Sequence, residues 1–485
     1  MIFNSSSYLL FLAIVYLIHY VTPHRWRWLP LLGAGYLFYA FLKVPYLPVI
    51  LILVTGISYG CGIAMAAQQE EARRRRWFWS GVSACVAVLV LLKYLPFFQS
   101  PMERIFGFNN AGSSTVITIG VSYFTFQAIS YLADIYLGME QPERHPGYFA
   151  LYLSFFPKLL QGPLERGGDL LPQLKKTYRF DYGSARTGVL LFVWGLFKKV
   201  VIADRLSEFV ATVYGNLSSS SSLSVLLATY CYAVQIYCDF SGYTDMALGT
   251  ALLFNIRLTQ NFKNPYLATS MADFWRRWHI SFSRWLFDYI FKPLQMQWRD
   301  WPKGGTACAL LVTFLVSGLW HGATWGFLVW GLLHGSYLAA SIYYRPLQKK
   351  IYRELGLENS RLQRLVQTVM VFHLVCFAWI FFRAQSLGDA FIAVDKILHV
   401  TLREMSFQLL RNTVGGLGMT QADLGIFIVS FIFVSDVSVR GLRSNDFEKL
   451  FRSPLPVRWL FYITLTLLVV LGARMNSVPY LYFQF

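Results

Sequence analysis

Long apolar stretches, separated by short polar or basic segments, recur from one end of the chain to the other. An α-helix needs roughly 20 residues to cross a bilayer, and several of these stretches are shorter than that. The shorter ones must be tilted, broken or re-entrant, and irregular backbone at membrane depth is tolerated only inside a protein-lined cavity. The pattern therefore predicts an all-α, polytopic integral membrane protein with about eleven transmembrane helices plus re-entrant pieces. The candidate spans are 8–21, 28–42, 46–66, 77–98, 114–137, 148–160, 186–202, 223–238, 241–254, 306–320, 322–342, 364–382, 423–440 and 458–473.

Basic residues in the connecting loops predict how the chain is oriented. The loop after the first span carries Arg25 and Arg27, and the loop after the third carries the arginine run 73–76. The loop near Lys43, between them, is almost uncharged. Because Lys and Arg concentrate in cytoplasmic loops, we expect the N-terminus outside and the arginine run in the cytoplasm.

The longest interruption of the apolar pattern, residues 255–305, contains eight Lys or Arg residues against three acids, which predicts a cytoplasmic segment. Within it, residues 272–293 show helical periodicity with one aromatic stripe. A helix of this kind typically lies in the membrane interface, so one amphipathic interfacial helix is expected. The stripe consists of Phe274, Trp278, Phe282, Trp285 and Tyr289.

Composition agrees with a membrane location. Hydrophobic residues make up 55% of the chain and charged residues 14%, against about 25% charged residues in soluble domains. The formal net charge is +18, but the basic residues are spread over short loops, which favours anionic lipid over nucleic acid as the counter-surface. The first ten residues lack a basic segment and a cleavage site, so we expect a retained first span and no removable signal peptide.

The six cysteines lie in apolar surroundings, and no two have CxxC spacing. Neither a metal site nor a disulfide framework is expected, and no bound cofactor is predicted. Packing is the better interpretation of these small apolar side chains.

The candidate chemistry centres on histidines, and His321 is the strongest candidate. Residues 304–344 contain no Asp, Glu, Lys or Arg and are long enough for two helices of about 20 residues each. Basic residues flank this stretch, so the turn SGLWHGATWG, with His321 in its middle, would lie far from the cytoplasm. A histidine can take a proton from a hydroxyl near neutral pH, and ionisable groups at membrane depth are functional candidates. The alternative is a histidine that only satisfies a hydrogen bond in a helix turn.

Other histidines have weaker claims. His279, in WRRWHISFS, is a second candidate, with a structural interfacial histidine as the alternative. His334 and His373 lie on apolar helical faces and are interpreted as packing residues.

Charged residues also occur between apolar runs. Asp239 and Asp245, in YCDFSGYTDMALG, would be costly at membrane depth unless paired or hydrated. They could line a polar cavity or hydrogen-bond a broken helix. Lys198 and Lys199, in GLFKKVVIAD, are expected to extend toward the interface.

In combination, these motifs resemble the membrane-bound O-acyltransferase (MBOAT) family, and within it the bacterial AlgI-like branch. The resemblance covers essentially the whole chain. The matching stretches are IGVSYFTFQAISYLADIY, FFPKLLQGPLER, GLFKKVVIAD, YCDFSGYTDMALG, NFKNPYLATSMADFWRRWHISFSRWLFDYIFKPL, SGLWHGATWGFLVWGLLHG, WIFFRA and the C-terminal YFQF.

The resemblance implies one membrane domain, residues 1–485, in which a ring of helices surrounds a central tunnel. N-terminal spans would occupy residues 1–113, the family core residues 114–382, and C-terminal spans residues 383–485.

The family's near-invariant histidine matches His321, and its second histidine matches His279; both are expected to be catalytic. His321 would act as general base or carry the acyl group, and His279 would orient the donor or share in proton transfer. Arg276, Arg277 and Lys292 could steer an anionic donor by Coulomb attraction. The substrate and tunnel candidates are Asp239, Asp245, Trp278, Trp320, Arg276 and Arg277.

The resemblance further implies an O-acyltransferase of the bacterial inner membrane that moves acetyl groups toward an extracytoplasmic polysaccharide such as alginate. The donor would be cytoplasmic acetyl-CoA, and the partner a periplasmic SGNH-type acyltransferase or another polysaccharide-modification protein. D-alanyl transfer to teichoic acid, as in the related DltB branch, is the alternative within the enzyme class. A glycan or anion transporter and a non-enzymatic scaffold are the alternatives outside it.

Overall fold

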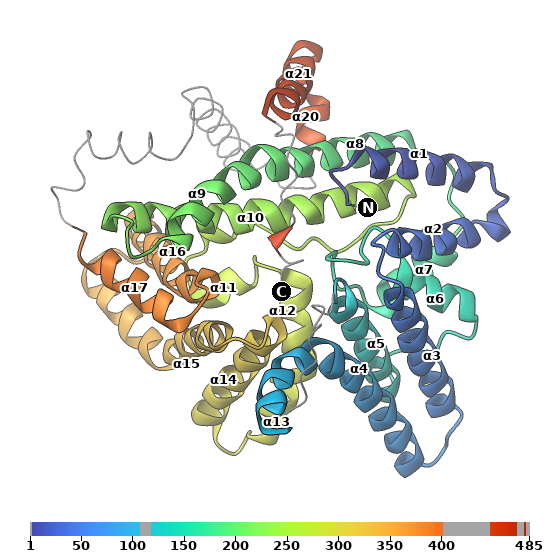
Figure 1. Ribbon diagram of the computed structural model, residues 1–485, viewed down its shortest axis with the longest axis horizontal. Helices are drawn as coiled ribbons and strands as arrows, with labels where there is room; N and C mark the ends of the chain where they lie inside the picture. The colour runs from blue at the N-terminus through green and yellow to red at the C-terminus, as the bar shows by residue number, and fades with distance from the viewer. Residues whose placement is uncertain (1, 107–117, 401–446, 473–479, 482–485) are drawn as a thin grey trace. The chain divides into compact units, whose positions relative to one another are not determined.

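The computed structural model describes residues 2–106, 118–400, 447–472 and 480–481 (Figure 1). Every regular element within these ranges is a helix, as the apolar pattern predicts. The chain forms two compact units, residues 1–192 with 246–260 and residues 193–245 with 261–485. Two helices, α8 (Tyr182–Phe197) and α10 (Ser222–Leu253), contribute residues to both units.

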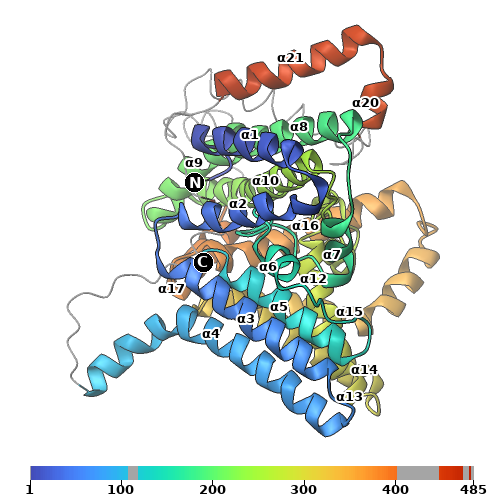
Figure 2. The same ribbon diagram turned by 90° about the vertical axis from the view of Figure 1, so that its right-hand side faces the viewer.

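In the first unit, α3, α4 and α5 lie side by side (Figures 1 and 2). Small residues permit this approach, since a Cβ added at Gly81 of α4 would lie 2.8 Å from Leu132 Cδ1 of α5. Nearly the whole of α5 is buried. The helices of this unit are α1 (Ser6–Val21), η1 (His24–Trp26), α2 (Trp28–Ala40), α3 (Tyr46–Ala66), α4 (Glu71–Phe106), α5 (Val121–Tyr136), α6 (Pro146–Ser154), α7 (Gly167–Lys175), the first part of α8 (Tyr182–Phe197) and the last part of α10 (Ser222–Leu253).

In the second unit, α14 and α15 form a tight hairpin across the turn 322–324. A Cβ added at Gly331 of α15 would lie 3.4 Å from the Cα of Gly318 on α14, so glycine on both helices allows the backbones to approach. The remaining helices of this unit are η2 (Lys198–Ala203), α9 (Asp204–Gly215), α10 (Ser222–Leu253), η3 (Pro265–Leu267), α11 (Met271–Trp275), α12 (Ile280–Leu286), η4 (Phe287–Phe291), α13 (Lys292–Gln297), α14 (Pro302–His321), α15 (Trp325–Glu354), α16 (Arg361–Arg383), α17 (Leu387–Leu398), α20 (Glu448–Arg452) and α21 (Leu455–Gly472).

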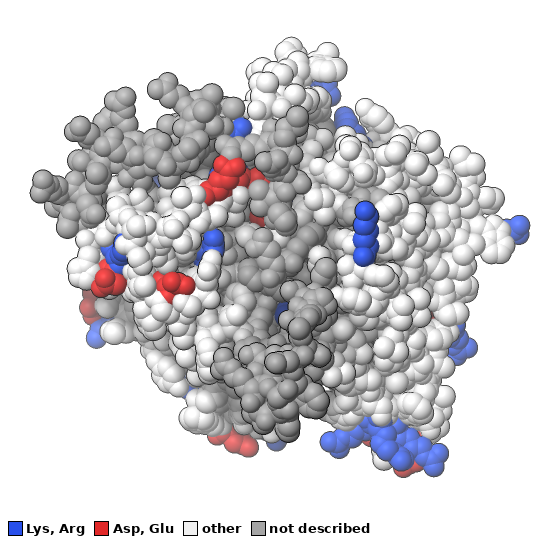
Figure 3. Space-filling model, in the orientation of Figure 1, with Lys and Arg blue, Asp and Glu red and all other residues white. Residues whose placement is uncertain are grey.

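Six helices in the described residues are long and apolar enough to cross a membrane, and α1 is a shorter apolar helix. Many large apolar side chains on them are exposed, including Leu53 at 49% and Leu460 at 67%, as expected for helices that face lipid. Charge is sparse over much of the face shown in Figure 3, and basic side chains gather at its lower right, over the ends of α3 and α4. The protein is therefore a multi-pass membrane protein. The candidate spans are 46–66, 71–93, 222–253, 302–321, 361–383 and 455–472.

Several predicted spans differ from the helices. The spans predicted at 223–238 and 241–254 are one continuous helix, α10. The stretch 148–160 contains only the nine-residue α6, followed by turns. The span predicted at 423–440 lies outside the described residues. The count of eleven spans and the ring with its tunnel stay predictions.

The expected interfacial helix over residues 272–293 is not one helix. It is divided into α11, α12, the π-helical η4 and α13, with His279 between the first two in a left-handed conformation. The predicted stripe nevertheless faces inward, because Phe274, Trp278 and Phe282 are fully buried and Trp285 is nearly so. The periodicity thus identified the buried face but not the interruption.

Candidate active site

His321 is the last residue of α14, and its side chain is only 4% exposed. The helix ends there because Gly322 takes an extended backbone conformation. Aromatic rings surround the imidazole, with centroids 4.6 Å away at Trp320, 5.0 Å at Trp330 and 4.9 Å at Phe382. This surface excludes water around an imidazole, a side chain that can exchange protons near neutral pH.

His279 precedes α12 and has a left-handed backbone, with φ 43° and ψ 54°. Asn261 holds the next residues in place by accepting two hydrogen bonds. Ile280 N donates to its carbonyl at 3.0 Å, and Ser281 N donates to its Oδ1 at 3.1 Å. The carbonyl of His279 accepts from Ser283 N at 2.9 Å. Positive φ is uncommon outside glycine, and such conformations often mark functional sites.

The imidazole of His279 is 1% exposed. Burial lowers its pKa to about 3, so the ring is neutral at physiological pH. A neutral imidazole offers one N–H donor and one nitrogen acceptor.

The two histidines meet in one aromatic cluster of the second unit. The ring of Phe282 stacks on Trp320 at 4.3 Å and lies 4.9 Å from His279 and 6.4 Å from His321. The ring of Trp320 itself lies 6.1 Å from His279. His279, Phe282, Trp320 and His321 are called the histidine cluster below. Residues distant in sequence thus form one buried, water-poor site, and Trp320 neighbours both histidines.

The other tunnel candidates in this segment have different surroundings. Trp278 contacts Phe262 at 5.1 Å and Trp379 at 5.3 Å, and is fully buried. Arg277 pairs with Asp273, Nε to Oδ2, at 3.0 Å. Arg276 pairs with the same carboxylate at 3.7 Å, and its side chain is 70% exposed. This exposure leaves Arg276 available to an anion approaching from solvent.

The acids Asp239 and Asp245 lie within an unbroken helix and are paired with buried lysines. Lys198 Nζ lies 2.5 Å from Asp245 Oδ2, and Lys199 Nζ lies 2.7 Å from Asp239 Oδ1 and 2.8 Å from Asp204 Oδ1. The expectation that the lysines extend to the interface is therefore wrong. Neither acid marks a helix break, because each has an internal counter-ion that removes the cost of a lone buried charge.

This ion-pair network adjoins the histidine cluster through the residue after Asp239. The ring of Phe240 lies edge-on to His279, with centroids 4.7 Å apart. The carboxylate of Asp239 also accepts the backbone N–H of Leu481 at 3.0 Å. Phe240 thus connects the segment that carries Asp239 to the histidine cluster.

The two histidines that the sequence predicted as packing residues, His334 and His373, have different surroundings. His334 is fully buried and accepts a hydrogen bond from Trp275 Nε1 at its Nδ1, 3.3 Å away, in agreement with a packing role. His373 is exposed and contacts Tyr230 Oη at 3.0 Å, so its packing interpretation is wrong.

A buried polar group in the first unit contains Lys158, which the sequence did not single out. It also contains Glu165, which the sequence pattern predicted to be one half of a self-neutralising pair with Arg166 at a helix break. Lys158 is 0% exposed, donates to Gln127 Oε1, and lies 5.1 Å from the Tyr152 ring. Glu165 accepts from Thr259 N at 2.5 Å. Burial lowers the pKa of Lys158 to about 7 and raises the pKa of Glu165 to about 7. Both residues lie in the motif FFPKLLQGPLER.

Comparison with known proteins identifies the family. The model of MBOAT, the membrane-bound O-acyltransferase family, matches residues 144–352, which include both histidines of the cluster. A peptidoglycan O-acetyltransferase of Helicobacter pylori is 34% identical over 75% of this chain and 72% of its own. A probable alginate O-acetylase AlgI of Pseudomonas putida is 32% identical over the full length of both chains. A teichoic acid D-alanyltransferase of Bacillus subtilis is more distant, 26% identical over 65% of this chain and 80% of its own.

These relatives cover both units, and their identity is high enough to assign family and reaction class. Transport and scaffolding, the alternatives outside the enzyme class, are set aside. The chain belongs to the MBOAT family and is an O-acyltransferase.

Proposed function

We propose that this enzyme transfers an acetyl group from cytoplasmic acetyl-CoA toward an extracytoplasmic polysaccharide at the bacterial inner membrane. The meeting of His279 and His321 in one buried aromatic cluster carries the proposal. The names of two relatives, a peptidoglycan O-acetyltransferase and a probable alginate O-acetylase, support both the acetyl group and the polymeric acceptor.

In the proposed reaction His321 acts as general base. It takes the proton of an acceptor hydroxyl while that oxygen attacks the thioester carbonyl carbon, so a C–O bond forms and the C–S bond breaks. The leaving thiolate then takes the proton back. Because His321 ends α14, the partial negative charge at the helix C-terminus stabilises the positive charge that its ring gains.

His279 acts on the donor. As a neutral ring it can donate an N–H to the thioester carbonyl oxygen, where negative charge develops during attack. The rings of Phe282 and Trp320 exclude water and so limit wasteful hydrolysis of the thioester. A second route, in which His321 carries the acyl group itself, uses the same residues.

The acceptor side of the proposal involves a partner. A periplasmic SGNH-type acyltransferase or another polysaccharide-modification protein would receive the group and place it on the polymer. The exposed Arg276 and its neighbour Arg277 would attract the anionic donor on the opposite side. D-alanyl transfer remains the second candidate because of the 26% identical teichoic acid enzyme, but that likeness is weaker than the two acetyltransferase matches.

Vesicles of known sidedness test donor and direction together. Inverted vesicles containing the enzyme and its polymer-modification system should transfer label from [¹⁴C]acetyl-CoA supplied outside, whereas right-side-out vesicles should not. Carrier protein loaded with D-alanine is the matched alternative donor. Label transfer from that carrier alone would replace the acetyl proposal with the D-alanyl one.

A further inference from the structure

One surface feature of the first unit, a hollow on α4, has no part in the reaction above. The described residues that line it are Arg73, Arg76, Trp77 and Ser80. Its volume is about 490 Å³, within the size range of small-ligand sites. Because the four residues follow one another at steps of three and four, they share one face of the helix. Figure 3 shows the basic side chains gathered over this end of α4.

The hollow carries positive charge that the described chain does not neutralise. The two carboxylates that precede the arginine run pair with Arg73 at 2.7 Å and with Arg74 at 3.3 Å. Within the described residues, no carboxylate lies within ion-pair distance of Arg75 or Arg76, and both are exposed. Only Arg76 of these two lines the hollow. Its guanidinium can therefore bind an anion bidentately without first breaking an ion pair.

The rest of α4 indicates which kind of anion reaches this site. Only 11% of the most apolar part of the span 71–93 is buried, so nearly all of this helix faces lipid. Trp77 is 42% exposed at the charged end, and tryptophan rings typically lie among lipid headgroups. The same face continues with the small, exposed Ala87 and with Leu91, which is 58% exposed. A lipid whose phosphate lies at Arg76 therefore finds an apolar surface for its acyl chains farther along the helix.

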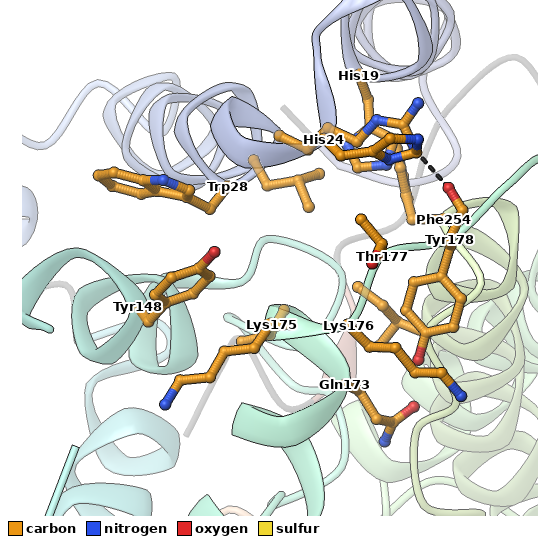
Figure 4. Close-up of a pocket in the computed structure, with 14 residues that line it drawn as sticks. His19, His24, Trp28, Tyr148, Gln173, Lys175, Lys176, Thr177, Tyr178 and Phe254 are labelled. Atoms are coloured by element: carbon orange, nitrogen blue, oxygen red, sulfur yellow. Dashed lines mark hydrogen bonds between the residues drawn. The ribbon is translucent and has the colours of Figure 1, made fainter. Parts of the chain in front are cut away.

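A second pocket of this unit does not offer a comparable site (Figure 4). It lies between the loop after α1 and residues 173–178, and the space inside it is about 30 Å³. One of its cations, Arg27, already donates to the carbonyls of Tyr178 at 2.5 Å and Thr22 at 3.1 Å. The hollow on α4 combines more room with an arginine that has no such internal acceptor.

We propose that the hollow on α4 binds the phosphate of an anionic glycerophospholipid. Arg76 binds the phosphate oxygens, Ser80 donates its hydroxyl hydrogen to a phosphate or ester oxygen, and the Trp77 ring contacts the glycerol. The uncompensated arginines repel a headgroup that also carries an ammonium, as in phosphatidylethanolamine, so an anionic headgroup is favoured. The proposal concerns lipid binding by the first unit and does not depend on the acetyl-transfer proposal.

Lipid retention by the purified full-length protein tests the proposal. Native mass spectrometry of micelles with equal amounts of dioleoyl phosphatidylglycerol and dioleoyl phosphatidylethanolamine counts each lipid that stays bound. Arg76→Gln removes the uncompensated charge from the hollow. Arg75→Gln is the matched control, because it removes one charge from the adjacent exposed arginine that does not line the hollow. Ser80→Leu fills the hollow without changing the charge.

A basic residue at an anionic headgroup contributes roughly fivefold in affinity, so Arg76→Gln should retain phosphatidylglycerol about fivefold more weakly. Arg75→Gln should change retention by less than about twofold, because no bilayer surface potential acts in a micelle. Ser80→Leu should also retain less of the lipid, which diffuse attraction of charge does not predict. Equal losses in the Arg75 and Arg76 variants, or equal retention of both lipids by the wild type, would overturn the proposal.

A soluble probe separates the lipid from a free phosphate ester. Calorimetry with glycerol 3-phosphate on the same wild-type and Arg76→Gln proteins should detect no comparable binding, because this probe lacks the acyl chains that contact the apolar face of α4. Binding of glycerol 3-phosphate as tight as that of phosphatidylglycerol, and lost in Arg76→Gln, would assign the hollow to a soluble phosphate ester and contradict the lipid assignment.

Discussion

At the scale of single residues, the backbone of His279 is as informative as its side chain. Its left-handed conformation lies between two short helices that the aromatic periodicity had joined into one. Histidine tolerates this region better than most residues, and asparagine better still. A substitution can therefore separate the shape of the turn from the chemistry of the ring.

His279→Asn should keep the thermal stability of the detergent-solubilised protein close to that of the wild type. His279→Ala should be less stable by about 1 kcal/mol, because alanine is disfavoured at positive φ. Both variants should lose acyl transfer by a factor of about 10² or more if the ring assists the reaction. If the His279→Asn variant kept more than a tenth of wild-type activity, residue 279 would serve only to form the left-handed turn.

The sequence located both histidines, but through different signals. His321 stood out as an ionisable residue in a long uncharged stretch, whereas His279 rose above a structural interpretation only through the family resemblance. The rings that join them, above all Phe282 on Trp320, could not be predicted. Such contacts depend on how α12 packs against α14, which no local pattern encodes.

At the scale of elements, α10 shows why a charged interruption was misread. Asp239, Ser241 and Asp245 break the apolar run, and the hydropathy pattern therefore predicted two spans. The helix continues because Lys198 and Lys199 neutralise these acids from η2. The helices α8 and α10 also approach each other closely beside these ion pairs, since a Cβ added at Gly242 of α10 would lie 2.7 Å from the carbonyl oxygen of Gly195 on α8. Pairing between segments far apart in sequence is invisible to a sliding window.

Removing one partner of the Lys198–Asp245 pair should be costly. Lys198→Met leaves a buried carboxylate without its counter-ion and should destabilise the protein by about 3–5 kcal/mol. The double variant Lys198→Met/Asp245→Asn should recover much of that loss, and a double-mutant cycle on unfolding in detergent measures the coupling.

An exposed pair provides the control for that cycle. Lys350 and Glu354 lie 3.8 Å apart at the surface of α15, so Lys350→Met should change stability by less than about 1 kcal/mol. Equal losses from Lys198→Met and Lys350→Met would contradict the structural importance of the buried network.

At the scale of the whole molecule, the sequence correctly predicted an all-helical, multi-pass membrane protein, and it placed the α14–α15 hairpin around His321. Length and hydropathy support six spans in the described residues, and the count of about eleven stays a prediction. Short elements such as α6 are apolar but lie inside the protein fold, so hydropathy alone cannot distinguish them from crossings.

Orientation is testable by labelling engineered cysteines with a membrane-impermeant maleimide. Arg75 and Lys349 are exposed and lie in basic segments. The variants Arg75→Cys and Lys349→Cys should therefore react with the maleimide in inverted vesicles and not in intact spheroplasts. Cysteine at Lys43 should show the reverse, and the unmodified chain gives the background of its native cysteines. Reaction of positions 43 and 75 from the same side would refute the predicted topology.

The central claim is that His321 performs the chemistry of an acyltransferase. Polymer O-acetylation should be measured in cells carrying wild type, His321→Ala or His373→Ala, with the membrane level of each protein determined in parallel. His373 is the matched control, an exposed histidine of the same unit outside the histidine cluster. The account predicts a loss of about 10² or more for His321→Ala at normal protein level and near-normal acetylation for His373→Ala. More than a tenth of wild-type acetylation in His321→Ala would contradict it and leave His321 as a structural residue.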